Sequence, residues 1–308
     1  MNILKKIVLI LTILSITLSA DDEAGGSGGA YLRMPADARI AALGNAGTVI
    51  LDDVNMSVGN PAAIPSIKTR QFSSSFQFLS LDRSYQTLSF GVALPPQAGM
   101  SVSWIHAGVD NIMGRNYSND IGLEYNWSQN AFIIGFGLNI TPWLSVGLSG
   151  KLLSDQLASS SSSGFSADVG LRVSPLKNLE LGFVLKDVSG KTTWDTSQES
   201  YVDFQTRKVD YYPLAYHFGL SYNLLDKVLF TGSYKYSDII EPTWHLGVEG
   251  KLWDAVFVRG GLNDGVATFG VGTSYKLWNN ISTRMDYAFL VGNLQQGSSH
   301  LFTWLFYF

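Results

Sequence analysis

The chain has 308 residues, no cysteine, a formal net charge of −4 and a charged fraction of only 15 %. The absence of cysteine excludes disulfides, thiol nucleophiles and Cys-ligated metals, and no basic patch suggests binding to nucleic acid. A soluble domain would carry roughly 25 % charged residues, whereas this chain has 13 % aromatic residues. Its length allows one large all-β domain without a second core.

Residues 1–20 have the pattern of a secretory signal peptide. Two lysines precede the apolar run Ile7–Leu14, and the small residues Ser19 and Ala20 follow it. A transmembrane anchor is the alternative, but the run is shorter than the roughly 20 residues that a spanning helix needs. We therefore expect export and cleavage, after which residues 21–28 form a flexible leader.

Residues 29–69 are rich in small residues and prolines, and nothing like them recurs later. The apolar spacing of residues 38–43 predicts about two helical turns. Asp52 and Asp53 could ligate a cation, but we interpret them as the N-cap of a short helix before Met56. An irregular segment ahead of a long sheet predicts an N-terminal plug, or hatch, inside a barrel.

Residues 70–308 alternate between apolar and polar side chains in segments of about ten residues. The apolar face could pack in a sandwich core or face lipid. Segments of this length suit tilted membrane strands, because sandwich strands average about 5 or 6 residues. Tryptophans near the segment ends suit an interfacial girdle. A lipid-facing charge would cost ~2–4 kcal/mol, so charged faces must look inward; these faces carry Lys151, Arg172 and Lys186.

The last segment has aromatic residues on one face and finishes on a phenylalanine. This ending resembles the signal by which outer-membrane barrels are recognised for insertion. We therefore expect the outer membrane as the location, and outer-membrane lipid and the barrel-assembly machinery as partners. The expected assembly signal comprises Trp304, Phe306 and Phe308.

The number of strands follows from parity, since two periplasmic ends require an even count. We join Ile121–Trp127 to the strand that ends at Ile140 through a bulge at Ser128–Asn130. The prediction is a transmembrane up-and-down β-barrel of about fourteen antiparallel strands. The serines from Ser159 to Ser163 indicate a flexible loop. The longer external loops are expected at Gly108–Asn119, Leu157–Ser162 and Ser189–Tyr211.

Several short motifs occur in a fixed order along the chain. They are Gly29–Leu32, Ala38–Arg39, Ala42–Gly44, Asp52–Asp53, Asn60–Ala62, Gly164–Phe165 with Asp168 and Gly170, Gly247–Glu249, Arg259–Gly261 with Asn263, Asp286–Phe289, and Ser299–His300. In this order they resemble the PorV/PorQ family of FadL-like outer-membrane barrels. The resemblance implies a fourteen-stranded FadL-type barrel with an N-terminal hatch, in a family whose named members serve type IX protein secretion. The candidate plug motif comprises Arg39, Gly44, Asp52, Asp53, Asn60 and Pro61.

Four charged residues are expected to meet in the lumen. Glu249 and Arg259 are equidistant from Asp254 in a short turn, which makes them cross-strand neighbours on the inward face. Arg284 and Asp286 face inward two strands further on. We predict that this lumen charge cluster braces the wall and accepts polar groups from the plug; a substrate-binding role is the alternative.

Candidate chemistry is sparse. The histidines fall on separate segments without metal-binding spacing, and no Ser, His and Asp grouping suggests hydrolysis. We expect no metal, no cofactor and no enzymatic activity. The four histidines are His106, His217, His245 and His300.

Two functional classes remain open. In the first, the barrel is a secretion component that engages exported proteins or secretion-system subunits at the cell surface, as the resemblance implies. In the alternative, it is a FadL-like uptake channel in which the hatch guards a pocket for a hydrophobic small molecule. A purely structural barrel is the third reading. The sequence does not separate these functions.

Overall fold

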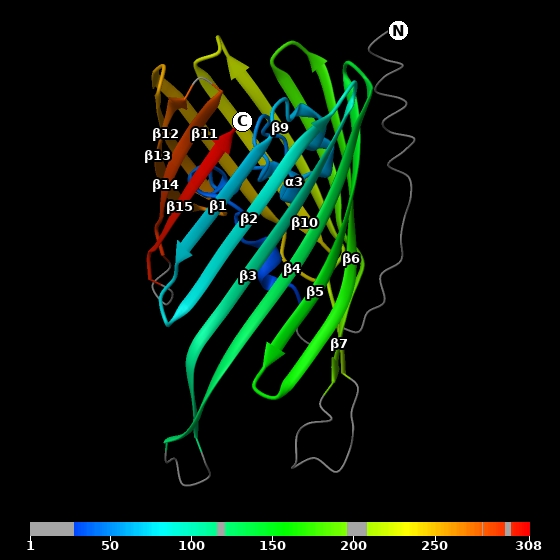
Figure 1. The fold of residues 1–308 in the computed structure, drawn as a ribbon, viewed down its shortest axis with the longest axis vertical. Coiled ribbons are helices and arrows are strands. Elements are labelled where there is room, and N and C mark those ends of the chain that lie inside the picture. Colours follow the sequence, from blue (N-terminus) through cyan, green and yellow to red (C-terminus); the bar gives the residue numbers. More distant parts are fainter. Residues whose placement is uncertain (1–27, 116–120, 196–207, 279, 293–296) are drawn as a thin grey trace.

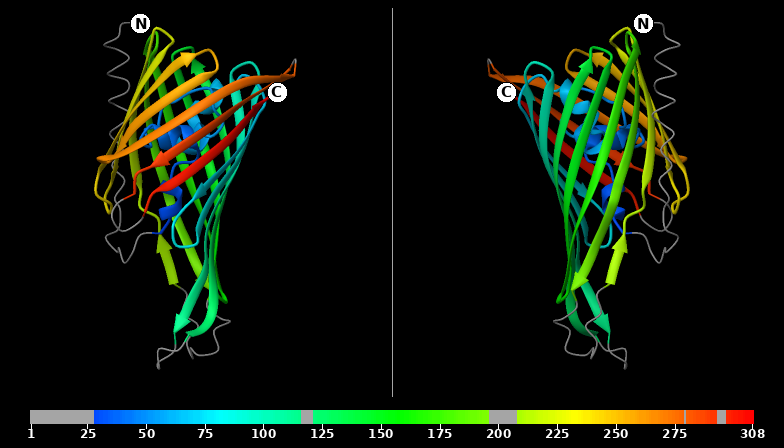
Figure 2. Two further views of the ribbon diagram at one scale, coloured as in Figure 1. Left: turned by 90° about the vertical axis from the view of Figure 1, so that its left-hand side faces the viewer. Right: turned by 90° about the vertical axis from the view of Figure 1, so that its right-hand side faces the viewer.

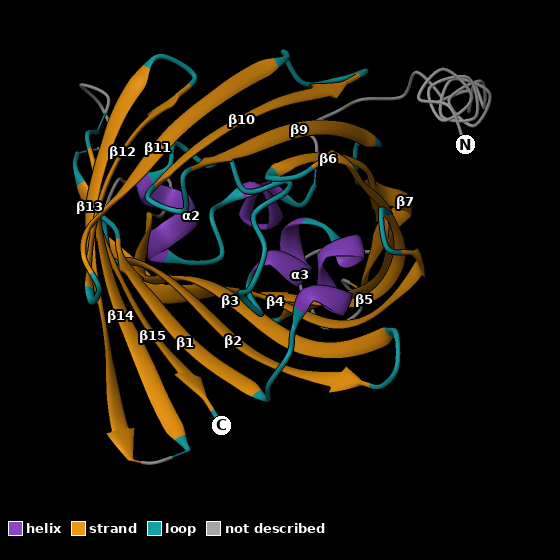
Figure 3. Cartoon of the chain, turned by 90° about the horizontal axis from the view of Figure 1, so that it is seen from above, coloured by secondary structure: helices purple, strands orange, loops and turns teal. Residues whose placement is uncertain are grey.

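The computed structural model describes residues 28–115, 121–195, 208–278, 280–292 and 297–308. A sheet closes into a barrel around an N-terminal inner segment, residues 28–69 (Figures 1 and 3). The predicted signal peptide, and the predicted leader up to residue 27, lie outside the described residues. The strands are β1 (Gln71–Phe78), β2 (Arg83–Leu94), β3 (Ala98–Arg115), β4 (Ile121–Thr141), β5 (Leu144–Leu157), β6 (Ser160–Leu176), β7 (Leu179–Asp195), β8 (Lys208–Tyr211), β9 (Ala215–Leu224), β10 (Val228–Ser237), β11 (Thr243–Trp253), β12 (Val256–Asn263), β13 (Val266–Trp278), β14 (Ile281–Leu290) and β15 (Ser299–Tyr307).

The ring is closed by the two ends of the sheet-forming chain. β1 pairs with β15 from Gln71 opposite Tyr307 to Phe78 opposite His300, and consecutive strands pair around the ring. The sheet has fifteen strands. However, β8 pairs with the far part of β7, beyond the residues that pair with β9, and so β8 and β9 share one position in the ring. The ring therefore has fourteen antiparallel strands, as predicted.

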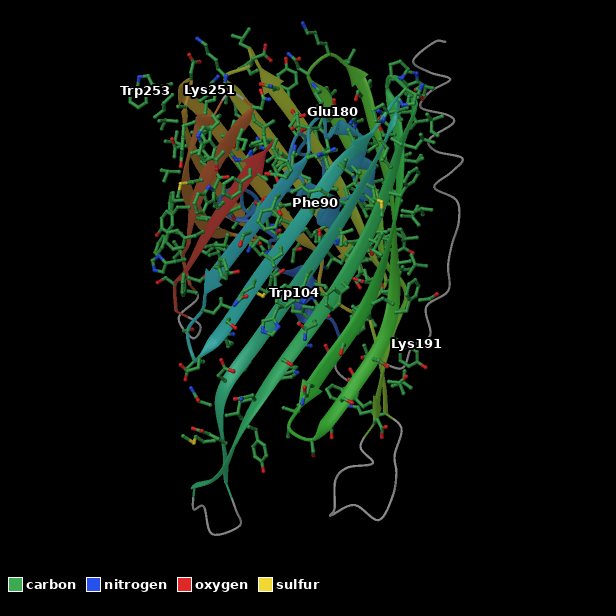
Figure 4. The ribbon with its side chains drawn as sticks, viewed as in Figure 1. Phe90, Trp104, Glu180, Lys191, Lys251 and Trp253 are labelled. Atoms are coloured by element: carbon green, nitrogen blue, oxygen red, sulfur yellow. The ribbon has the colours of Figure 1, made fainter. Side chains whose placement is uncertain are left out.

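The outer face of the ring is apolar over most of its height. In β4 and β5, Phe132 and Leu152 are 52 % and 60 % exposed, whereas the adjacent Ile133 and Lys151 are buried. Phe90 and Trp104 lie on the same outer face (Figure 4). So much contiguous exposed apolar surface suits a bilayer rather than water, because a closed barrel satisfies its backbone groups within lipid.

The two ends of the barrel differ. One end carries short turns, where Lys251 and Trp253 project (Figure 4), and we call it the turn end. At the opposite loop end, the wall formed by β3–β7 extends much further than the wall formed by β12–β15 (Figures 1 and 2). The barrel is therefore a slanted tube whose loop end is taller on one side.

The predicted bulge in β4 at Ser128–Asn130 is at the wrong position. β4 is continuous, as predicted, but Ser128–Asn130 pair regularly with residues 106–108 of β3. The register shifts instead in β3, between Val109 and Ile112. Asn111 has a positive φ of 56° there, a conformation that asparagine tolerates better than most residues.

Three predicted loops are largely strand in the parts that the structure describes. β3 extends to Arg115, into the first predicted loop. β7 extends to Asp195, into the third predicted loop, and β8 forms the last four residues of that loop. The predicted flexible loop at the serines is wrong, because Ser160–Ser163 pair with residues 154–157 across a tight turn. Ala158 enables this turn through a positive φ of 54°. The remaining parts, residues 116–120 and 196–207, lie outside the described residues.

The inner segment folds into four short helices that lie within the ring (Figure 3). Their apolar side chains are almost all buried, and they pack on β2–β6 and on β12–β15. Within the described ranges, no helix has the length and hydrophobicity to span a bilayer. The helices are η1 (Ala30–Arg33), α2 (Ala38–Ala42), α3 (Met56–Gly59) and η2 (Pro61–Ser66).

Inward-facing wall glycines allow this close packing. A Cβ atom added at Gly147 would overlap Pro61, and one added at Gly261 would overlap the backbone of Gly44. A Cβ added at the neighbouring Gly260 would meet no atom within 4 Å. The wall thus contacts the inner segment backbone to backbone at these positions.

We expect Gly261→Ala to destabilise the barrel by ~1–3 kcal/mol, because the new methyl group overpacks the contact with Gly44. Gly260→Ala is the matched control on the adjacent outward position and is expected to be neutral. Heat-modifiable mobility on gels, measured as the temperature of unfolding, checks both variants. Equal unfolding temperatures for Gly261→Ala and the wild type would contradict the contact.

Candidate functional site

Helix α2 is positioned by its N-cap and by small side chains. Asp37 caps it, with Oδ1 accepting the backbone N–H of Ile40 at 2.7 Å. The backbone N–H of Ala38, the first residue of α2, donates to Thr303 Oγ1 of β15 at 2.8 Å. Ala41 and two further alanines of α2 are buried beside β14 and β15. This close approach directs Arg39 toward β11.

Arg39 forms a two-point ion pair with the wall. Its Nε and Nη2 donate to the two carboxylate oxygens of Glu249 at 2.8 and 2.7 Å. Glu249 also accepts from Nε of Arg259, its cross-strand partner, at 2.6 Å. A bidentate arginine–carboxylate pair fixes orientation as well as distance.

The contacts continue around the wall and return to the inner segment. Arg259 Nη1 donates to Asp286 Oδ1 at 2.7 Å, and Arg284 Nε donates to Asp286 Oδ2 at 2.7 Å. Arg284 Nη2 donates to Asp53 of the inner segment. We call the whole set the charge chain; in order it comprises Arg39, Glu249, Arg259, Asp286, Arg284 and Asp53.

The charge chain alternates in sign, with three positive and three negative groups, and each of its side chains is at most 12 % exposed. It begins and ends on the inner segment and crosses β11, β12 and β14. The sequence predicted four members as a lumen cluster and the other two as plug-motif residues; the structure brings all six together. Removing one partner of such a pair typically costs ~3–5 kcal/mol, because the other charge stays buried.

Three further plug-motif residues, Gly44, Asn60 and Pro61, shape the backbone of the inner segment. Gly44 has a φ of 68° and donates to Thr268 Oγ1 at 3.1 Å. Asn60 accepts the N–H of Ala62 at 2.9 Å and donates to the carbonyl of Thr48 at 3.0 Å. The structure places Pro61 at the start of η2, against a wall glycine.

The predicted N-cap role of Asp52 and Asp53 is wrong. The N-cap of α3 is Asn55, whose N–H donates to Asp53 Oδ1 at 2.9 Å. Asp53 is instead buried, and its other carboxylate oxygen forms an ion pair with Arg284. Asp52 is exposed, with a φ of 68°.

Residues 44–49, which we call the seal segment, are held to the wall by neutral hydrogen bonds. Thr231 donates to the carbonyl of Ala46 at 2.7 Å, and Ser233 donates to Thr48 Oγ1 at 2.9 Å. Further contacts come from Ser221 and His245, which hydrogen-bond the carbonyls of Val49 and Gly44 at 3.0 and 2.9 Å. The seal segment thus runs along β9–β11.

A second ionic cluster lies across the lumen. Lys151 Nζ is 2.6 Å from Asp168 and 2.7 Å from Asp187, and its side chain is only 1 % exposed. Lys186 Nζ donates to the carbonyl of Val58 in the inner segment at 2.9 Å. Alternation along the strands indicated that both lysines face inward; it carried no information about their partners.

Two cavities open at the loop end. The larger, about 500 Å³, lies between the inner segment and β1–β4, with apolar lining that includes Leu79, Trp127 and Leu290; we call it the mouth cavity. The smaller, about 300 Å³, faces β7–β11, and we call it the basic cavity. Met34 and Pro35 line both, so a single ridge of the inner segment separates them.

A third cavity of about 380 Å³ lies at the turn end and is lined mainly by polar and charged side chains, among them Arg39 and Glu249. The seal segment separates it from the basic cavity: Gly47 and Thr48 line the basic cavity, whereas Val49 lines the turn-end cavity. A molecule that crosses the barrel along this side therefore has to pass the seal segment.

The basic cavity contains two histidines that lie far apart in sequence, His217 and His245. They were not grouped from the sequence, because they lie on β9 and β11, which are separated by β10. Lys186 and Lys235 line the same cavity. No sequence motif marks this site. The one available signal was the period-two alternation, which places inward-facing residues on neighbouring strands.

The three residues of the predicted assembly signal lie on or just beyond β15. Trp304 and Phe308 are 44 % and 45 % exposed on the outer face. Phe306 lies beside Phe72 of β1, with ring centroids 6.5 Å apart. Their role in assembly remains a prediction.

Similarity to solved structures extends over almost the whole barrel. The Pseudomonas putida toluene transporter TodX matches with a TM-score of 0.61 and 11 % identity, covering 87 % of this chain and 96 % of that chain. A Pseudomonas aeruginosa FadL homologue matches at 0.59 and 12 %, covering 88 % and 98 %. The CymD monoaromatic hydrocarbon channel matches at 0.63 and 10 %, covering 88 % and 97 %.

At these identities the matches establish the fold, a FadL-type barrel of fourteen strands, and the matched proteins are transporters and channels rather than enzymes. No protein-family model and no curated protein sequence matches the chain. The finer resemblance to the PorV/PorQ family therefore remains a prediction.

We expect Glu249→Ala and Arg259→Ala each to destabilise the barrel by ~3–5 kcal/mol. The double variant should lose less than the sum, with a coupling energy of ~0.5–3 kcal/mol, because neither residue then leaves the other unpaired. Urea unfolding of detergent-solubilised barrel measures this cycle. The control is the exposed pair Lys251 and Asp254, 3.3 Å apart, for which little coupling is expected. Strict additivity at Glu249 and Arg259 would contradict the charge chain.

The buried carboxyl of Asp37 predicts a pH dependence. Its Oδ2 has no hydrogen-bond partner among the described residues. Burial, and then repulsion from Asp53, raise the pKa of Asp37 from 3.8 to about 7. The protonated carboxyl therefore contributes fully to stability below pH 3.8. As the pH rises from 3.8 through about 7, the free energy of unfolding falls by at most ~1.4 kcal/mol per pH unit, and the contribution is lost.

Asp37→Asn should flatten this slope, because asparagine keeps the N-cap but does not titrate. Asp37→Ser, a second non-titrating cap, should act in the same way. The measurement is urea unfolding at intervals from pH 4.5 to 8. If the free energy of unfolding of both variants depends on pH as strongly as that of the wild type, Asp37 is not the source of the pH dependence.

Proposed function

We propose that this chain is a FadL-like outer-membrane barrel that admits a hydrophobic small molecule at its loop end and releases it past the seal segment. The observation that carries the proposal is the series of cavities: two at the loop end and one at the turn end, with the seal segment between them. Their sizes fall within the ~300–1,000 Å³ that is typical of small-molecule sites.

The mouth cavity suits capture of an apolar solute. Its lining includes Leu79, Trp127, Val266 and Leu290, and it opens at the end that parity places outside the cell. Burying apolar surface there would contribute roughly 25 cal/mol per Å². From this cavity the solute has to pass only the ridge at Met34 to reach the basic cavity.

The distribution of contacts indicates which part moves. Arg39 and Asp53, the two ends of the charge chain, flank the seal segment in sequence and hold it through buried ion pairs. Between them, the seal segment is held by neutral hydrogen bonds, each contributing ~0.5–1.5 kcal/mol net. The seal segment can therefore shift while its flanking residues stay fixed to the wall.

The ordered motifs along the chain favoured the other function, a secretion component that engages exported proteins. The solved structures of similar fold support uptake better, since they are a toluene transporter and a monoaromatic hydrocarbon channel. The secretion role stays a prediction from sequence. Both functions share the location in the outer membrane.

A disulfide across the seal tests the proposed route. Thr48 Oγ1 and Ser233 Oγ are 2.9 Å apart, and the chain has no native cysteine to interfere. In the Thr48→Cys/Ser233→Cys variant, oxidation should reduce uptake of radiolabelled toluene to the background of cells without the barrel. A thiol reductant should restore it.

The matched control is Ser89→Cys/Ser103→Cys, whose hydroxyl oxygens are 3.0 Å apart but join two wall strands. Its oxidation should leave uptake unchanged. Mass spectrometry confirms both crosslinks. Unchanged uptake with a fully formed seal disulfide would overturn the proposed route.

A further inference from the structure

Lys235 is exceptional among the inward-facing cations. It lies on β10, directly between His217 of β9 and Thr243 of β11, and lines the basic cavity. In the parts of the barrel that the structure describes, its ammonium group has neither a hydrogen bond nor an ion pair. The other cations near the inner segment each have a hydrogen-bond or ion-pair partner; they are Arg33, Arg39, Arg83, Lys151, Arg172, Lys186, Arg259 and Arg284.

The surroundings of Lys235 are positive on balance. His217 and His245 line the same cavity, and so does Lys186, whose nearest carboxylate, Asp168, is 3.9 Å away. Among the described residues, the one acidic side chain that lines the cavity is Glu241, which is exposed in the β10–β11 loop. An ammonium group confined in a largely apolar cavity without a counterion is unfavourable. An anion entering the cavity would relieve this cost.

The rest of the lining is apolar. Leu32, Met34, Ile40 and Val58 of the inner segment contribute to it, together with Ile240 from the loop. The volume of about 300 Å³ is at the lower limit for small-molecule sites. Arg33, which also lines the cavity, is exposed and donates to the carbonyl of Gly28 at 3.3 Å. The cavity thus combines an ammonium group that has no partner among the described residues with a compact apolar space.

We propose that the basic cavity binds a compact organic acid, with its carboxylate on Lys235 and its aromatic or branched alkyl body against the apolar lining. The inference deepens the proposed function by naming the class of solute, and it rests on that function only for the route by which the acid arrives. The hydroxyl of Thr243 and the His217 ring, on the neighbouring strands, flank the carboxylate position.

The test compares two probes that share one body. Purified barrel in phosphatidylcholine nanodiscs is titrated calorimetrically with 4-tert-butylbenzoate and with the neutral 4-tert-butylbenzamide, and empty nanodiscs provide the baseline. We expect the acid to bind at least tenfold more tightly than the amide. Lys235→Met should abolish that preference, and Lys235→Arg should retain most of it.

Lys276→Met, on the exposed turn-end part of β13, is the control and should keep the wild-type preference. Heat-modifiable mobility verifies that each variant is folded. Equal affinities for acid and amide in the wild type, or a preference that persists in Lys235→Met, would overturn the inference and leave the proposed route intact. If the seal disulfide fails to block uptake but binding of the acid still depends on Lys235, the proposed route fails and the inference stands.

Discussion

The structure depends on the charge chain that begins at Arg39, crosses the wall and returns at Asp53. Six charged side chains are buried inside a membrane barrel, an arrangement that is tolerable only because their signs alternate and each group has a partner. The pairs fix both ends of the seal segment. The alanine packing of α2 and the contacts of the wall glycines then set how closely the inner segment approaches the sheet.

This arrangement divides the inner segment into fixed and movable parts. Ion pairs hold the residues on either side of the seal segment, whereas serine, threonine and histidine side chains hold the seal itself. Neutral hydrogen bonds can be exchanged for water or solute at little net cost, but a buried ion pair cannot. Under the proposed function, the inner segment thus combines anchored flanks with a passage that opens along β9–β11.

The lumen is also asymmetric in charge. Around the charge chain and around Lys151, positive and negative groups balance, and these regions brace the wall. In the basic cavity they do not balance, because Lys235 stands without a carboxylate among the described residues. Balanced charges suit structural bracing, and an unbalanced charge beside apolar side chains suits recognition of an amphipathic solute.

The sequence by itself determined the barrel wall. Period-two alternation and strand length depend only on neighbouring residues, so the lipid-facing side, the count of fourteen and the pairing of Glu249 with Arg259 across a short turn could all be derived locally. Only the tertiary structure decided how the inner segment meets that wall. Arg39 and Glu249 are 210 residues apart, and His217 reaches the cavity of His245 only because β10 lies between their strands. Such contacts depend on the closed ring and on which wall positions lack side chains, and no local pattern encodes either.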